Sequence, residues 1–119
     1  MEDKGIVRSG NYEIASSPIG TWEDRLPERV TGTKLMSGGA LTILPGCRVT
    51  KRRCTCEEMT MFVVAGNGTA EIAEESADIA QFTLLHVFAN QEYAIANTSA
   101  APLRIICYMS PAHKEESFI

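Results

Sequence analysis

The side chains of this chain best suited to bind a metal ion or attack a substrate are its four cysteines and two histidines. Two of the cysteines, Cys54 and Cys56, form a Cys-x-Cys pair, and neither His86 nor His113 is near that pair in the sequence. Thiolates can bind zinc, but a zinc site normally takes four good donors, which two thiols do not supply. Catalysis would need an activated nucleophile, a base or a metal. We therefore predict no catalytic residues and no metal site.

The spacing of the four cysteines is not that of a disulfide scaffold. They are Cys47, Cys54, Cys56 and Cys107. Side chains two residues apart on an extended strand point the same way, so a Cys-x-Cys pair on a strand cannot easily form a disulfide with itself. Reduced thiols are typical of a cytosolic or nuclear protein. We interpret Cys54 and Cys56 as small core residues that face inward.

Short apolar segments separated by turn residues must position these side chains. The Asn67-Gly68 pair lies between two such segments and predicts a hairpin, because both residues tolerate a positive φ. Short strands with turns every 8–12 residues or so are typical of a β-sandwich or barrel. The expected strands cover residues 40–44, 59–65, 69–73, 82–88, 92–96 and 103–109.

Length and charge limit the classes of protein to consider. A chain of 119 residues fits a single domain. Residues 1–30 are polar with weak periodicity, and we predict an N-terminal arm or edge segment there and a barrel over residues 31–119. The net charge of −4 argues against direct nucleic-acid binding, since such binders are normally basic. No apolar run suggests a membrane span or a signal peptide, so we expect an intracellular protein.

The order of the segments resembles the two motifs of the cupin family. The resemblance covers about residues 35–109 and is carried by Pro45-Gly46, the Cys-x-Cys pair, a strand into Gly66, Asp78 and the segment Asn90–Asn97. In metal-binding cupins the first motif carries His-x-His and then Glu, and the second carries a His before an Asn. Those four ligand positions fall here on Cys54, Cys56, Thr60 and Tyr93, and Asn97 matches the Asn. The resemblance implies an all-β, cupin-type jelly-roll barrel with a degenerate pocket and no cofactor.

A narrower resemblance is carried by Gly38-Gly39-Ala40-Leu41, Lys51-Arg52, Met61-Phe62-Val63-Val64 and Asn90-Gln91-Glu92-Tyr93-Ala94-Ile95-Ala96-Asn97. Together these segments are similar to the C-terminal cupin of the centromere protein C family. That cupin also lacks the metal ligands, and it is a homodimerisation module at the centromere rather than an enzyme. The resemblance implies a nuclear, non-enzymatic homodimerisation and protein-docking module of a centromere or kinetochore scaffold. Its partners would be a second copy and a centromere or kinetochore protein.

Alternation along the strands assigns side chains to the inner or outer face of each sheet. If Thr60 lines the pocket, Phe62 and Val64 also point inward. If Tyr93 points inward, Ile95 and Asn97 do so with it. On the last strand we expect Arg104 to face outward. The core residues of that strand would then be Leu103, Ile105, Cys107 and Met109.

The same alternation leaves four apolar residues on the outer face, which an isolated monomer would expose to water. An exposed apolar patch is the signature of an interface, and a twofold dimer is the commonest arrangement that covers one. The predicted dimer interface consists of Met61, Val63, Ile106 and Tyr108.

One basic cluster, Arg48, Lys51, Arg52 and Arg53, has two interpretations. It is a solvated edge that discourages strand pairing, or it binds an acidic partner segment. The alternative function for the whole domain is a small cupin enzyme or ligand sensor. Such a protein would use the barrel pocket formed by Cys54, Cys56, Thr60 and Tyr93.

Overall fold

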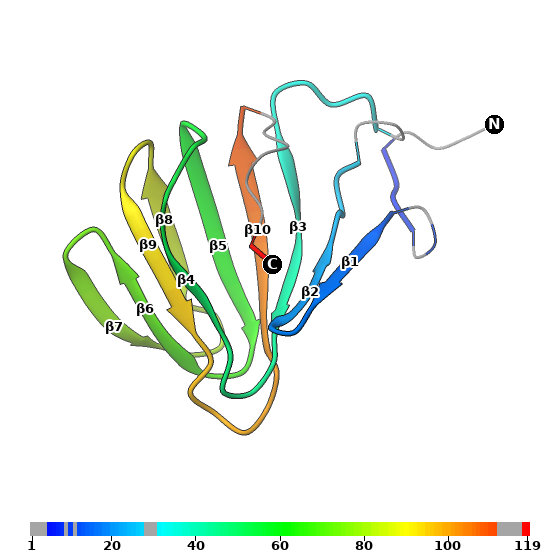
Figure 1. Cartoon of the computed structure of the whole chain (residues 1–119). Helices are drawn as coiled ribbons and strands as arrows, with labels where there is room; N and C mark the ends of the chain where they lie inside the picture. Colours follow the sequence, from blue (N-terminus) through cyan, green and yellow to red (C-terminus); the bar gives the residue numbers. More distant parts are fainter. Residues whose placement is uncertain (1–4, 9, 11, 28–30, 112–117) are drawn as a thin grey trace.

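The structure, a computed structural model, describes residues 5–8, 10, 12–27, 31–111 and 118–119. Within these ranges β-strands dominate (Figure 1), and no helix is both long and apolar enough to cross a membrane. The strands are β1 (Ile14–Ser17), β2 (Gly20–Glu23), β3 (Ser37–Ile43), β4 (Arg48–Arg53), β5 (Glu58–Ala65), β6 (Gly68–Ile72), β7 (Glu75–Ile79), β8 (Leu84–Phe88), β9 (Glu92–Ala96) and β10 (Leu103–Ser110).

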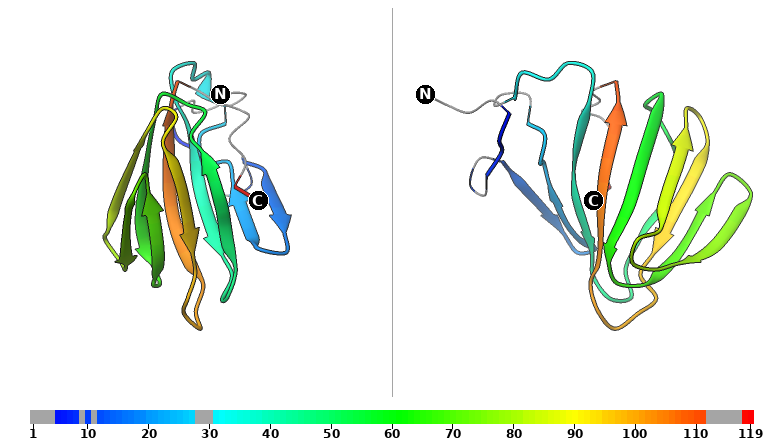
Figure 2. Two further views of the ribbon diagram at one scale, coloured as in Figure 1. Left: turned by 60° about the vertical axis from the view of Figure 1, so that its left-hand side comes forward. Right: turned by 180° about the vertical axis from the view of Figure 1, so that it is seen from behind.

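The strands form two antiparallel sheets that face each other (Figures 1 and 2). One sheet has six strands in the order β1-β2-β3-β10-β5-β8, and the other has four in the order β4-β9-β6-β7. Many neighbouring strands are distant in the sequence, so the two halves of the chain interleave. This arrangement confirms the prediction of an all-β jelly-roll barrel.

Two strands that the sequence did not predict, β4 and β7, are poor in apolar residues. Four of the six residues of β4 are basic. Strand β7 buries only Ile79. Both strands lie at the edges of the four-stranded sheet, where charged side chains can remain in water and oppose pairing with another chain. Their edge positions explain why they lack the apolar pattern of a central strand.

The hairpin of β1 and β2 extends the six-stranded sheet beyond β3. Gly39 permits this close approach, because a Cβ atom at that position would lie 2.0 Å from the backbone oxygen of Glu23. The Glu23 carboxylate holds the hairpin to β10 through Arg104 at 3.0 Å, and it also pairs with Arg25 at 3.1 Å. Burial alone would raise the pKa of Glu23, but the hydrogen bonds and charges of these two arginines outweigh it and lower that pKa.

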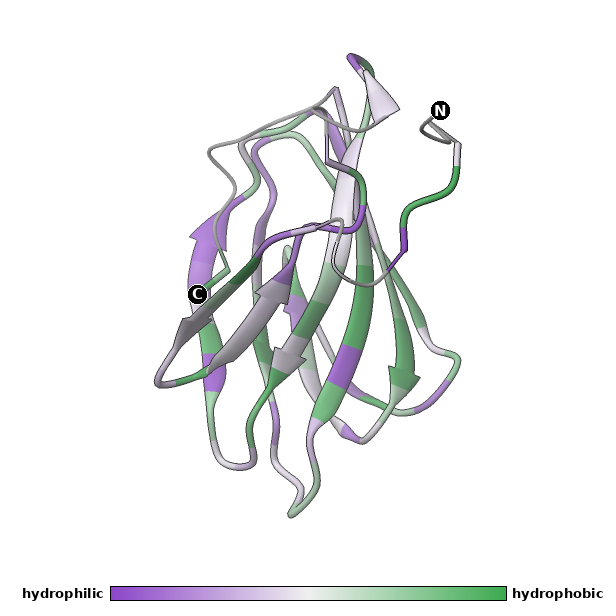
Figure 3. Ribbon diagram, turned by 90° about the vertical axis from the view of Figure 1, so that its right-hand side faces the viewer, coloured by the Kyte–Doolittle hydropathy of each residue, from purple (hydrophilic) through white to green (hydrophobic). Residues whose placement is uncertain are grey.

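The core lies between the two sheets. Figure 3 shows hydrophobic stretches along the packed strands, whereas β1 and β2 are paler. Tyr93, Ile95 and Asn97 are buried at the second motif. The residues of β10 that point inward are Leu103, Ile105, Cys107 and Met109. Alternation therefore predicted the inner faces of β9 and β10 correctly.

Candidate functional site

Three of the four side chains assigned to the pocket lie in the interior of the barrel. Cys54 and Cys56 are almost fully buried, and Tyr93 is completely buried. The ring of Phe118 packs edge-on against that of Tyr93, with 6.5 Å between their centroids, and is tilted against Trp22 at 5.2 Å. Phe118 is itself buried. Side chains of the protein therefore fill the space beside Tyr93.

The fourth assigned residue, Thr60, is on the other side of β5. It is half-buried and lies opposite His86 on β8 and Tyr108 on β10, so its placement in the pocket is wrong. Met61 and Val63 are fully buried, so their placement on the outer face is wrong as well. Residues directly opposite each other on paired strands share a face, and β10 therefore sets the inner face of β5.

The sulfur atoms of Cys54 and Cys56 are only 3.1 Å apart. Our assumption of an extended strand here is wrong, because residues 54–57 lie between β4 and β5 and include a bend. The thiol of Cys54 also lies 3.6 Å from the carbonyl oxygen of Cys56. The thiol of Cys56 lies 3.4 Å from the backbone carbonyl oxygen of Glu58. The bend thus turns two side chains toward each other that a strand would hold apart.

Asn97, which matches the asparagine of the second cupin motif, joins β9 to neighbouring segments. Its side-chain Nδ2 donates hydrogen bonds to the carbonyl oxygens of Ile43 at 2.9 Å and Ala101 at 2.8 Å. Its Oδ1 accepts hydrogen bonds from the backbone nitrogen of Ser99 at 3.0 Å and from the hydroxyl of Ser99 at 2.9 Å. Both amide hydrogens are used, so this side chain is a structural clamp.

Large apolar side chains lie on the outer surface of the six-stranded sheet. We name them the outer apolar face: Phe62 (37% exposed), Phe82 (69%), Leu84 (58%), Phe88 (54%) and Tyr108 (43%). Phe62 lies between Ile106 on β10 and Leu84 on β8, so the face crosses three strands. Ile106 and Tyr108 were assigned to this surface from the sequence. The expectation that Phe62 points inward was wrong, and the residues of β8 were not assigned to either face.

Phe82 has an unusual backbone conformation within the outer apolar face. Its φ is 72°, a left-handed value that is a genuine outlier for a bulky side chain. Such strain costs about 1–3 kcal/mol and persists only where the surrounding structure enforces it. The Phe82 ring stacks on Phe62, with centroids 6.1 Å apart and 18° between the planes. The chain thus presents an exposed aromatic ring at an energetic cost.

The four residues of the predicted basic cluster lie together on β4: Arg48, Lys51, Arg52 and Arg53. The ammonium group of Lys51 is 3.4 Å from the Glu71 carboxylate on β6. Arg53 donates a hydrogen bond to the carbonyl oxygen of Asn90 at 2.7 Å. Arg48 is exposed and has no ion-pair partner within the described part of the chain. The cluster therefore retains a positive charge that is not neutralised.

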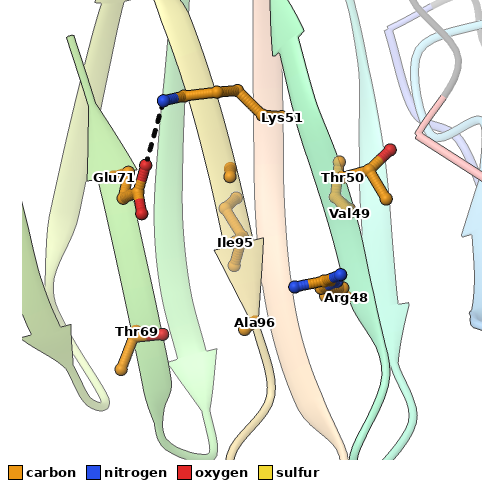
Figure 4. Close-up of a pocket in the computed structure, with 9 residues that line it drawn as sticks. Arg48, Val49, Thr50, Lys51, Thr69, Glu71, Ile95 and Ala96 are labelled. Atoms are coloured by element: carbon orange, nitrogen blue, oxygen red, sulfur yellow. Dashed lines mark ion pairs between the residues drawn. The ribbon is translucent and has the colours of Figure 1, made fainter.

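A hollow of about 400 Å³ adjoins this cluster on the four-stranded sheet (Figure 4). The small side chains of Ala94 and Ala96 on β9 leave space between β4 and β6. The lining residues are Arg48, Val49, Thr50, Lys51, Thr69, Glu71, Ala94, Ile95 and Ala96. The sequence identified the basic side of this hollow but not its floor.

No family model matches the sequence, and no curated protein matches it either. Solved structures do match. The Drosophila melanogaster CENP-C cupin domain has a TM-score of 0.73 at 10% identity, covering 92% of this chain and 83% of its own. The Schizosaccharomyces pombe Cnp3 cupin domain matches with a TM-score of 0.72 at 10% identity. The match covers 83% of this chain and 68% of the Cnp3 chain. The chain has the cupin fold. A predicted oxalate decarboxylase from Thermotoga maritima also matches, with a TM-score of 0.73 at 18% identity. The match covers 89% of this chain and 98% of the decarboxylase chain.

The side chains at the cupin ligand positions do not fit the metals that a cupin barrel usually holds. Imidazole and carboxylate donors suit iron, manganese or nickel, whereas this cupin fold offers two thiols and a phenol at the matching interior positions. Within the described residues no group of three or more His, Cys, Asp or Glu side chains could hold a metal ion. The donor set therefore gives no basis for metal chemistry in this barrel.

Proposed function

We propose that this cupin-fold domain is a homodimerisation and protein-docking module of a centromere or kinetochore scaffold protein, and that it acts in the nucleus. The observation that carries the proposal is the outer apolar face. Its five large side chains cross β5, β8 and β10, and one of them is held there by a strained backbone. The likeness to the CENP-C and Cnp3 cupin domains supports the same function.

A second copy of the chain is the occupant that we propose for the outer apolar face. Burying a large apolar side chain contributes roughly 1.5–3 kcal/mol, before the costs of association are subtracted. In a twofold dimer both copies bury the same residues, so each such residue contributes two buried side chains to the interface. The His86 ring, 2.9 Å from the Glu58 carboxylate, supplies a polar group within the same surface.

The interior of the barrel supports a role without catalysis. Phe118 packs against Tyr93, which occupies one of the positions that match the metal ligands of cupins. The amide of Asn97 is occupied by backbone and side-chain partners. A ligand would have to displace the protein's own side chains to enter this space.

We assign docking of the other partner to the hollow beside β4. The occupant that we propose is an extended, acidic segment of a centromere or kinetochore protein. Arg48 supplies a positive charge without an ion-pair partner in the described residues, and the Thr50 and Thr69 side chains supply hydroxyl groups. This local positive charge is opposite in sign to the net charge of the whole chain, which is −4.

Light scattering on purified protein tests the dimer. Replacing Phe62 and Leu84 with Glu buries charges at a symmetric interface, where each is unpaired or meets its twin, a strongly unfavourable arrangement. We expect this double variant to be a folded monomer that fails to concentrate at centromeres in cells. The matched control adds the same two charges to the exposed loop at Thr98 and Ala100 and remains dimeric.

Two results would contradict the proposal at different levels. A wild-type chain that is monomeric at tens of micromolar would exclude the dimer. Normal centromere recruitment of a proven monomer would exclude the functional role while leaving the fold unaffected.

Binding of a synthetic Glu-rich peptide, measured by fluorescence anisotropy, tests the docking surface. We expect salt to weaken the binding and Arg48→Glu to abolish it, because the contact is electrostatic. Lys34→Glu makes the same charge change outside the hollow and keeps the affinity. Equal losses in the two variants would indicate a response to net charge only and would refute the site.

A further inference from the structure

The Cys54 and Cys56 thiols are closer together than metal coordination requires. Neither cysteine is in a disulfide, and their sulfur atoms are 3.1 Å apart. Two thiolates on one tetrahedral zinc ion, with bonds of about 2.3 Å, lie about 3.8 Å apart. A disulfide brings the sulfur atoms to about 2.05 Å. The pair therefore needs a shift of only about 1 Å to form a covalent bond.

Backbone hydrogen bonds hold the bend that brings the two thiols together. The nitrogen of Cys54 donates to the carbonyl oxygen of Gln91 at 2.9 Å, and its own carbonyl accepts from Asn90 at 3.0 Å. On the other side of the bend, the nitrogen of Glu57 donates to the carbonyl oxygen of Ser110 at 3.0 Å. The Cys-x-Cys segment is thus attached to the connection between β8 and β9 and to the end of β10. This anchoring prearranges the sulfur atoms before any reaction.

We propose that Cys54 and Cys56 are an oxidation site that forms a reversible disulfide with hydrogen peroxide as the oxidant. The exposed fractions of the two residues, 1% and 3%, favour an oxidant as small as peroxide over a second protein. The site is independent of the outer apolar face and of the hollow beside β4.

The reaction has two steps. The thiolate of one cysteine attacks an oxygen of peroxide, an S–O bond forms, the O–O bond breaks, and the departing hydroxide takes up a proton to become water. The second thiolate then attacks the resulting sulfenic sulfur, an S–S bond forms, the S–O bond breaks, and a second water leaves. The two thiols lose two electrons, and peroxide gains them. A dithiol reductant restores both thiols by exchange.

The other two cysteines provide internal controls. Cys107 lies within β10 opposite Met61 on one side and Gly39 on the other, so neither of its cross-strand neighbours offers a second thiol. Cys47 is partly exposed and lies 3.7 Å from the carbonyl oxygen of Pro18. A reaction governed by exposure alone would select Cys47, whereas one governed by prearranged geometry selects the pair.

Intact-mass and thiol analysis of the folded, reduced 119-residue chain tests the site. With one equivalent of peroxide we expect the loss of two hydrogen atoms and of two of the four thiols. Peptide mapping should find the link between Cys54 and Cys56, and dithiothreitol should reverse it. Cys47→Ser should react in the same way, whereas Cys56→Ser should gain oxygen at Cys54 instead of forming the link. Circular dichroism before and after treatment verifies that the chain is folded.

Two results would overturn the proposal. One is a folded chain that retains the Cys54 and Cys56 thiols while Cys47 reacts. The other is a link between Cys54 and Cys56 that appears only under denaturing conditions, which would show that the native bend does not prearrange the pair.

Discussion

Met61 on β5 lies directly opposite Cys107 on β10, and both side chains are fully buried. The pairing continues across β5 to Leu85 on β8, which is also buried. The inner faces of three strands are therefore aligned in one row. The neighbouring row contains Ile106, Phe62 and Leu84, and it forms part of the outer surface.

This register predicts stability losses of different size at two adjacent residues. Met61→Ala leaves a cavity in the core and should lower the free energy of unfolding by about 2–5 kcal/mol. Thr60→Ala changes a half-exposed side chain and should cost less than about 1 kcal/mol. Urea denaturation of the two variants measures both values. A larger loss at Thr60 than at Met61 would indicate the face assignment derived from the motif alignment.

The sequence pattern determined the faces of some strands and left others undetermined. On β10, Arg104 breaks the apolar run and identifies the outer face. The segment Met61-Phe62-Val63-Val64 on β5 is apolar at every position, so alternation cannot tell which of its side chains face the core. The inner face of β5 is fixed by its pairing with β10, which is a long-range contact. The apolar excess on β5 was nevertheless a signal for an apolar outer surface, to which Phe62 contributes.

The geometry of the Cys-x-Cys pair was not accessible from the sequence. The spacing alone predicts two parallel side chains on a strand. The bend arises because β4 ends at Arg53 and β5 begins at Glu58, each in a different sheet. A change of sheet is a property of the topology, and no residue between these two positions is a glycine or proline that would reveal it.

The donor chemistry of the barrel predicts a metal-free protein. Two thiols and a phenol replace the imidazoles and carboxylate that suit iron, manganese or nickel. Elemental analysis after mild dialysis should find none of these metals, and no zinc, at a stoichiometric level. About one metal ion per chain would refute this prediction. Zinc that disappears in a Cys54→Ser, Cys56→Ser variant would assign a zinc site to the pair.

The Glu23 carboxylate should make stability depend on acidic pH. Because Arg25 and Arg104 lower the pKa of Glu23 in the folded state, its contribution is fully present above the unfolded pKa of about 4.3. The contribution is lost as pH falls through the lower, folded pKa. Thermal unfolding from pH 6 downward should show a smaller loss of stability below about pH 5 for Glu23→Gln than for wild type. Equal slopes would mean that the two arginines do not stabilise the charged form.

Phe82 offers a test that separates stability from association. Phe82→Gly removes the cost of a left-handed conformation for a bulky side chain, and Phe82 is 69% exposed, so few contacts are lost. We expect the stability of the isolated chain, measured below the dimer dissociation constant, to be unchanged or to rise by up to about 1 kcal/mol. Sedimentation equilibrium should show self-association at least tenfold weaker, because an aromatic ring is missing from the outer apolar face.

Ala73 is the matched control for Phe82, since its φ is also left-handed at 54°. It lies in the connection between β6 and β7, in the other sheet. Ala73→Gly makes the same relaxation of the backbone and should leave the dimer affinity unchanged. If both variants weaken association equally, backbone flexibility rather than the Phe82 ring controls it. If Phe82→Gly destabilises the monomer by several kcal/mol, the ring serves the fold, and the strain at Phe82 is not evidence for an interface.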